Sequence, residues 1–172
     1  MGINLLTEVL SVGIKDMYAA EKQFSELLPL IKLMSKSYPL HMILENQSSE
    51  IQSQVKRLKS IFMILGKEPD GKTCGSMKGL VCEAKELINQ IKGRNVLDAV
   101  LIFSVRKMFH YMISSYGPLE TFTSLLKLSE VSQLIRENLD ELLTAEEELN
   151  RIAKYDVNID ALYSQPVNGS AL

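Results

Sequence analysis

Four long segments of this 172-residue chain carry apolar residues that recur at alternating steps of four and three. They cover about residues 4–36, 39–65, 95–127 and 129–156. This spacing places the apolar residues on one face of an α-helix, and it is typical of helices that pack nearly parallel to one another. A helix of about 30 residues is roughly 45 Å long and cannot bury such a stripe alone. The sequence therefore predicts an all-α fold in which four helices form a bundle.

Each segment has its own predicted apolar stripe. In the first segment the stripe consists of Leu10, Ile14, Met17, Glu21, Phe24, Leu28 and Ile31. In the second it consists of Leu44, Ser48, Ile51, Val55, Leu58, Phe62 and Leu65. In the third it consists of Ile102, Val105, Phe109, Met112, Tyr116 and Leu119. In the fourth it consists of Val131, Ile135, Asn138, Leu142, Ala145, Leu149 and Ile152, and we expect all four stripes to share one core.

Proline, glycine and serine mark where the predicted helices begin, bend and end. Pro39 suits the first turn of the second helix, and Gly66 ends that helix. Ser129 is a good N-cap for the fourth helix. Pro29 and the Gly-Pro pair at 117–118 lie inside predicted helices, so we expect them to bend the chain there.

The connection between the second and third long segments holds a further short helix, predicted at 76–92. A connection of about 28 residues can carry the chain back along the bundle, which is the ferritin-like topology. We expect one bundle domain over residues 1–156. The turn-rich residues 157–172 are predicted to form a tail on the surface or on a partner.

Composition and charge exclude several classes of function. The net charge is −2, with 19 basic and 21 acidic residues and no basic stripe, so we expect no nucleic-acid partner. No apolar run reaches about 18 residues and no signal peptide is present, which predicts a cytoplasmic protein without a membrane partner. Cys74 and Cys82 match no zinc or redox spacing and suit a reducing compartment. No nucleophile with a base and no phosphate-binding loop is recognisable.

Glu21 gives the clearest functional signal among the polar residues in stripe phase. A buried carboxylate costs several kcal/mol unless it is protonated, paired or bound to metal. A dimetal bundle typically takes a Glu from each of two helices and a Glu-x-x-His pair from each of the other two. The chain contains no Glu-x-x-His pair, and its third stripe offers Phe109 and Met112, which do not bind a hard iron ion. Counting ligands therefore predicts no intact dimetal site.

Several stretches taken in order make the chain similar to a known family. They read KDMYAAEKQ at 15–23, QVKRL at 54–58, GKTCGSMKGL at 71–80, LDAVLI at 97–102, KMFHYMISSYG at 107–117 and LDELLTAEEEL at 139–149. Over about residues 5–155 the chain resembles the YciE/YciF-like family of bacterial ferritin-like proteins, which are associated with stress. The resemblance implies a four-helix bundle, usually a homodimer, with a dimetal-type site between the long helices.

The family's acidic positions are only partly kept in this chain. Glu21, Glu50 and Glu141 match family acids, whereas Ser49 stands where a Glu is usual and Gln52 where some members have His. The third helix of the family reads Glu-His-Tyr-Glu, and here residues 109–112 read Phe-His-Tyr-Met. Leu142 replaces a common second Glu of the fourth helix.

The resemblance and the ligand count together lead to three hypotheses. The leading one is a non-enzymatic, structural or stress-associated bundle protein without metal or other cofactor. In it, core residues replace the former site; these are Phe109, Met112, Leu142, Ser49 and Gln52. The second hypothesis is a residual iron or manganese site with weak oxidase or metal-handling activity, held by Glu21, Glu50, His110 and Glu141. The third is a helical protein-interaction module that uses an outer surface or the tail.

His110 distinguishes the first two hypotheses, since it lies beside the predicted stripe of the third helix. As a ligand it would converge with the three glutamates. As a core or dimer-interface histidine it would instead bond to a carbonyl or a carboxylate.

Overall fold

The computed structural model describes residues 5–91, 93 and 96–163. Within these ranges all of the regular secondary structure is helical. The helices follow in the order α1 (Leu6–Met34), α2 (Tyr38–Ile64), α3 (Gly75–Gln90), α4 (Leu97–Leu125) and α5 (Ser129–Ile152). A π-helical turn, η2 (Ala153–Val157), then leads into α6 (Asn158–Tyr163). The predicted all-α class is confirmed, and the bounds of the long helices differ from the predicted ones by a few residues.

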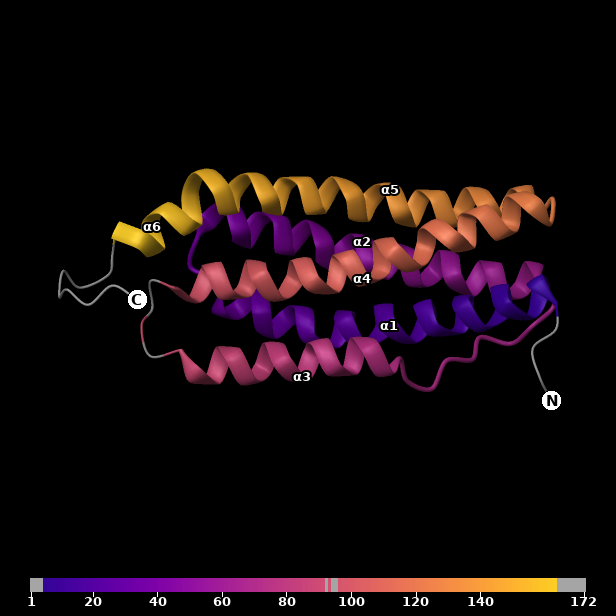
Figure 1. Ribbon diagram of the computed structural model, residues 1–172, viewed down its shortest axis with the longest axis horizontal. Coiled ribbons are helices and arrows are strands. Elements are labelled where there is room, and N and C mark those ends of the chain that lie inside the picture. The colour runs from indigo at the N-terminus through magenta and orange to yellow at the C-terminus, as the bar shows by residue number, and fades with distance from the viewer. Residues whose placement is uncertain (1–4, 92, 94–95, 164–172) are drawn as a thin grey trace.

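The long helices α1, α2, α4 and α5 form a four-helix bundle (Figure 1). Around the bundle α1 packs against α2, α2 against α5, α5 against α4, and α4 against α1. The short helix α3 lies outside this ring and packs against α1 and α4. It follows α2 in the chain and runs back along the bundle to the start of α4 (Figure 1). This is the predicted ferritin-like topology, including the extra helix in the long connection.

The predicted stripes of α1, α4 and α5 form the core, since every one of their residues is buried. The stripe of α2 is partly wrong. Ser48, Val55 and Leu65 are only half-buried, whereas Gln47 and Gln54 are buried. At Ser48 and Val55 the buried residue is the one before the predicted residue, whereas Leu44, Ile51, Leu58 and Phe62 are buried as predicted, so the inner face of α2 is rotated by only part of the roughly 100° that one residue spans.

The ends of the helices follow the predicted signals in most places. Ser37 caps α2, with its hydroxyl accepting a hydrogen bond from the backbone N–H of Leu40 at 3.4 Å. Gly66 follows the end of α2 at φ +64°, a conformation that glycine adopts without steric cost. The prediction that Ser129 caps α5 is wrong, because Leu128 occupies the N-cap position and no side chain bonds there. Figure 1 shows α4 slanting toward α5 in its second half, which agrees with the bend predicted around 117–118.

The connection around 65–74 is fastened to α1 through polar contacts. Gln23 of α1 accepts a hydrogen bond from the backbone N–H of Cys74 at 2.7 Å and donates one to its carbonyl at 3.3 Å. The Cys74 thiol accepts from the N–H of Met77 at 3.3 Å and so caps α3. Gly71 passes so close to α1 that an added Cβ would lie 2.5 Å from the Lys15 carbonyl oxygen.

The predicted boundary between bundle and tail does not hold over the described residues. Helical structure continues past residue 156 through η2 and α6, and Val157 and Ala161 are buried. Apolar residues at that four-residue spacing extend the core beyond α5. The rest of the predicted tail, 164–172, lies outside the described residues.

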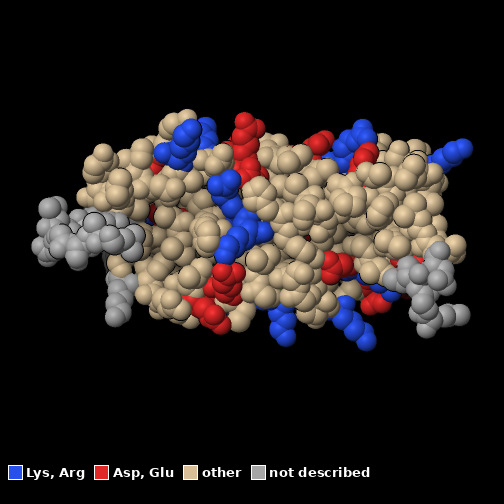
Figure 2. All heavy atoms as spheres, viewed as in Figure 1, with Lys and Arg blue, Asp and Glu red and all other residues tan. Residues whose placement is uncertain are grey.

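Charges of both signs are interspersed on the face of the molecule shown in Figure 2, with basic and acidic side chains adjacent near its middle. None of the helices in the described ranges combines the length and the apolar character needed to cross a membrane.

Candidate functional site

Glu21 lies fully buried in the middle of α1, in the stripe between Met17 and Phe24. The hydroxyl of Tyr116 on α4 donates a hydrogen bond to its Oε1 atom. Its Oε2 atom has no partner among the described residues. Loss of hydration raises the pKa of Glu21 to about 8, and the Tyr116 hydrogen bond only partly opposes this shift. Glu21 is therefore protonated at neutral pH.

Asn138 of α5 connects this acid to the other side of the bundle. Its Nδ2 group donates to the Tyr116 hydroxyl oxygen at 3.0 Å and to the Gln54 carbonyl at 3.3 Å. Its Oδ1 atom accepts from Nη1 of Arg57 on α2 at 3.0 Å. Burial raises the pKa of Tyr116, and so does neighbouring Glu21, so its phenol stays protonated and donates to Glu21.

Arg57 reaches from α2 to two carboxylates on α5. Its Nη1 and Nη2 atoms bond to the two oxygens of Glu141 at 2.9 and 2.5 Å, and its Nε atom lies 2.9 Å from Glu137. Gln54 also donates to Glu141, at 3.0 Å. The two-pronged bond with Glu141 raises the pKa of Arg57, so the guanidinium stays charged. We call the connected set the seam network; it consists of Glu21, Gln54, Arg57, Tyr116, Glu137, Asn138 and Glu141.

Glu50 lies near this network without a direct bond to Arg57. Its half-buried carboxylate accepts a hydrogen bond from the Nε2 group of Gln47. Burial raises the pKa of Glu50, and the negative charge of Glu141 raises it further. The negative charge of Glu141 raises the pKa of both Glu21 and Glu50, and the positive charge of Arg57 lowers both. These three predicted ligands therefore interact electrostatically.

His110 does not join them. Its side chain is 60% exposed, and its Nε2 atom lies 3.1 Å from Glu146. Glu146 also binds Arg106, through Nε at 2.9 Å and Nη2 at 2.5 Å. His110 therefore lies neither with the three glutamates nor in the core; it contacts a carboxylate, as one predicted alternative has it, and its place at a dimer interface stays a prediction. It follows the buried Phe109, and one residue turns a helical side chain by about 100°, here out of the core.

Two of the five residues predicted to fill the former site do not lie in the core. Ser49 and Gln52 are exposed on α2, and Gln52 bonds to the Ser25 hydroxyl at 3.1 Å. They belong to the outer face of α2. The other three, Phe109, Met112 and Leu142, are fully buried.

The residues present do not fit a dimetal centre. In the described ranges no group of three or more His, Cys, Asp or Glu side chains is arranged to hold a metal ion. A permanent cation, Arg57, already bonds to Glu137 and Glu141. Placing a metal ion beside that guanidinium would add electrostatic repulsion in a partly buried region.

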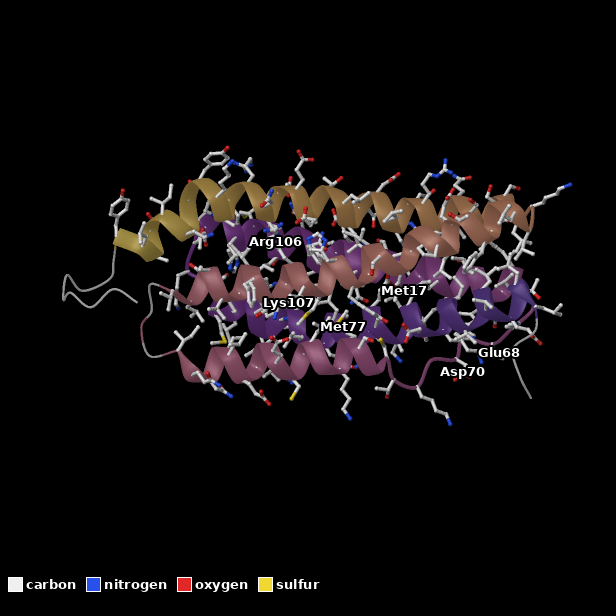
Figure 3. All side chains as sticks on the ribbon, in the orientation of Figure 1. Met17, Glu68, Asp70, Met77, Arg106 and Lys107 are labelled. Atoms are coloured by element: carbon white, nitrogen blue, oxygen red, sulfur yellow. The ribbon has the colours of Figure 1, made fainter. Side chains whose placement is uncertain are left out.

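A separate groove of about 690 Å³ lies between α3, α4 and the η2–α6 segment. Leu80, Ile102 and Phe103 give it an apolar wall, and Arg106 and Lys107 lie along α4 (Figure 3). Both cations are paired outside the groove, Arg106 with Glu146 of α5 and Lys107 with Glu83 of α3. No acidic residue is among the described residues that line it.

Sequence reasoning missed Arg57 and Gln54 as members of the site. The available signal was the polar pair Gln47 and Gln54, which shares a face with Ile51 and Leu58 at the core-facing spacing. Arg57 gives no such signal, because it is adjacent to that face and reaches the network only through its long side chain.

Comparison with known proteins agrees with this architecture. The family described as a domain of unknown function, DUF892, matches residues 5–162. The curated protein YciF of Escherichia coli is 29% identical over 162 residues, which cover 92% of this chain and 96% of YciF.

Solved structures give the same result. The crystal structure of the E. coli stress protein YciF matches with a TM-score of 0.84 and 26% identity, over 95% of this chain and all of that one. YcfI of Rhodopseudomonas palustris matches with a TM-score of 0.84 and 31% identity, over 86% of this chain and 94% of that one. A Xanthomonas campestris protein shares the fold at 18% identity and a TM-score of 0.73, over 94% of this chain. The chain therefore belongs to the DUF892 family and is a YciF-like ferritin-like bundle protein.

Proposed function

We propose that this protein is a non-enzymatic, stress-associated bundle with a structural role, acting as a cytoplasmic homodimer without bound metal. The stress association rests on similarity to YciF, named as a stress protein. The structural role draws on similarity to YcfI, which is described as a candidate structural protein. The observation that carries the proposal is the full burial of Phe109, Met112 and Leu142, three apolar residues at positions where the resemblance predicts acids.

Other features of the bundle interior support the same proposal. Protonated Glu21 needs no metal to neutralise it, since loss of hydration raises its pKa to about 8. A redox centre would need open coordination positions and oxygen or nitrogen ligands, which Phe109, Met112 and Leu142 do not supply.

Metal loading tests the proposal. The purified protein and a Glu21→Ala variant are incubated anaerobically with Fe(II) or Mn(II), desalted and analysed for metal per chain. We expect only traces of metal on both proteins, and a dimer by light scattering. Stoichiometric metal on the wild type, lost in the variant, would overturn the proposal and favour the metal-handling alternative through Glu21, Glu50 and Glu141.

The groove supports a second candidate function, the binding of a ligand with an apolar body and an acidic group. Its apolar wall would contact the body, and Lys107 would exchange Glu83 for the ligand's acid. The volume, about 690 Å³, lies within the range of small-molecule sites.

Calorimetric titration with decanoate tests this second function, with decanol as the uncharged comparison. We expect decanoate to bind the wild type and to bind Lys107→Gln and Phe103→Ala more weakly. Lys59→Gln, on a different surface, is the matched control and should leave binding unchanged. Equal binding of decanol and decanoate, or no binding, would rule the function out.

A further inference from the structure

The groove between α3, α4 and the η2–α6 segment changes character along its length. Its lining on α4 extends from Ala99 to Ser114, a rise of about 22 Å at 1.5 Å per residue. Along that rise apolar side chains come first, then two cations, then polar groups, in the order Ala99, Ile102, Phe103, Arg106, Lys107, His110 and Ser114. We call these three parts the apolar end, the cationic middle and the polar end.

The apolar end has room for a hydrocarbon chain of medium length. From Ala99 to Lys107 the helix rises by about 12 Å, which is comparable to the extended chain of decanoate. Phe103 is 53% exposed, and Leu80 of α3 lines the groove as well. A chain lying here would therefore remove apolar surface from water on both sides of the contact.

The cationic middle can take an anionic group without breaking a buried ion pair. Lys107 pairs with Glu83 at 2.5 Å, and the two side chains are 34% and 48% exposed. Such surface pairs contribute little to stability, so exchanging Glu83 for a ligand anion costs little. Arg106 binds Glu146 through Nε and Nη2, which leaves its Nη1 group to donate. A guanidinium beside an ammonium group suits a phosphate.

The polar end distinguishes this groove from a site for a simple fatty acid. Ser76 of α3 and Ser114 of α4 are both exposed and line it. The Ser114 hydroxyl donates to the Tyr111 carbonyl at 2.9 Å and keeps lone pairs that can accept a hydrogen bond. Nε2 of His110 lies against Glu146, so Nδ1 is the ring nitrogen left for a ligand. A fatty acid held at the cationic middle would leave these groups to water.

We propose that the groove binds a phospholipid with one medium-length acyl chain and a hydroxylated head group, of the lysophosphatidylglycerol type. The acyl chain lies along Phe103, and the phosphodiester accepts hydrogen bonds from Arg106 and Lys107. The glycerol head bonds to Ser76 and Ser114. A phosphodiester is charged and carries a substituent on each side, so it matches a cationic middle between an apolar and a polar end. The inference rests on the proposed binding of apolar acids in this groove.

Calorimetric titration with decanoyl lysophosphatidylglycerol tests the inference, at concentrations too low for micelles. Decanoyl lysophosphatidylcholine is the comparison, because it has the same chain and phosphate but a head group without hydroxyls. We expect the glycerol lipid to bind about fivefold more tightly, as one or two additional hydrogen bonds would give. Ser76→Ala combined with Ser114→Ala should remove this preference. Ser124→Ala, at an exposed position of α4 outside the groove, is the matched control and should keep it.

Phe103→Ala should weaken the binding of both lipids, since they share the acyl chain that it contacts. Equal affinity for the two lipids, or a preference that survives the double serine substitution, would overturn the inference. Decanoate titrated in parallel separates this failure from that of the proposed function. Decanoate that binds while the glycerol lipid shows no preference would refute only the inference, whereas failure of decanoate and of both lipids to bind would refute the groove function itself.

Discussion

Glu21 combines a fully buried carboxyl group with a single hydrogen-bond donor, Tyr116. Its pKa rises from 4.5 in the unfolded chain to about 8 in the fold, chiefly through loss of hydration. Between pH 4.5 and about 8 the folded state therefore keeps a proton on Glu21 that the unfolded state has released. Stability from this group is complete below about pH 4.5 and falls as the pH rises toward 8, by on the order of 5 kcal/mol.

Glu21→Gln removes this titration while keeping the shape of the protonated acid. We expect the variant to lose less stability than the wild type between about pH 5 and pH 9, because no buried charge forms. Urea denaturation across that pH range measures the difference. Glu26→Gln, at an exposed position of the same helix, should follow the wild-type curve. Parallel curves for wild type and Glu21→Gln would contradict the raised pKa.

Tyr116→Phe removes the hydroxyl that joins α1 to α5. Both Glu21 and Asn138 then lose a hydrogen-bond partner inside the core. We expect a loss of about 1–3 kcal/mol in the free energy of unfolding at neutral pH. Chemical denaturation measures it, and Tyr38→Phe, whose side chain is largely exposed, should change stability by less than about 0.5 kcal/mol.

At the scale of single elements, α2 shows what periodicity could and could not predict. The pattern placed the helix correctly, because Ser37, Pro39 and Gly66 define its ends. Its inner face was mispredicted because Gln47 and Gln54 are polar yet buried, so hydrophobicity gave too little contrast between the faces. In α1 and α4 large apolar residues leave no such ambiguity.

The connection before α3 allows a prediction at the same scale. Gly71→Ala should destabilise the fold by about 1–3 kcal/mol, because its Cβ would lie 2.5 Å from a backbone oxygen of α1 and the connection must move away. Gly79→Ala inside α3, where nothing lies within 4 Å, should stabilise it by about 0.5–1 kcal/mol. Urea denaturation of the pair measures both effects. Equal effects of the two substitutions would show that the connection does not pack tightly on α1.

Across the whole molecule one continuous core joins the long helices, α3 and the η2 turn. We therefore expect cooperative unfolding, with helix content by circular dichroism and tyrosine fluorescence changing together. The chain has no tryptophan, so its six tyrosines report on packing. Two separate transitions in urea would contradict a single cooperative core.

The sequence by itself determined the helices, their order, the ferritin-like connection and most of the core. These depend on local periodicity and on short-range signals such as proline and glycine, which each segment carries without reference to the others. It also indicated that Glu21 is buried and that the ligands of a dimetal site are incomplete.

Only the tertiary structure decided which polar groups meet. His110 faces outward to Glu146, Ser49 and Gln52 face solvent, and Arg57 extends across to Glu141. The physical reason is that a helix turns by about 100° per residue, and long side chains reach beyond their own face. The rotation of each helix and the reach of Arg57 are set by packing between helices, which no single segment encodes.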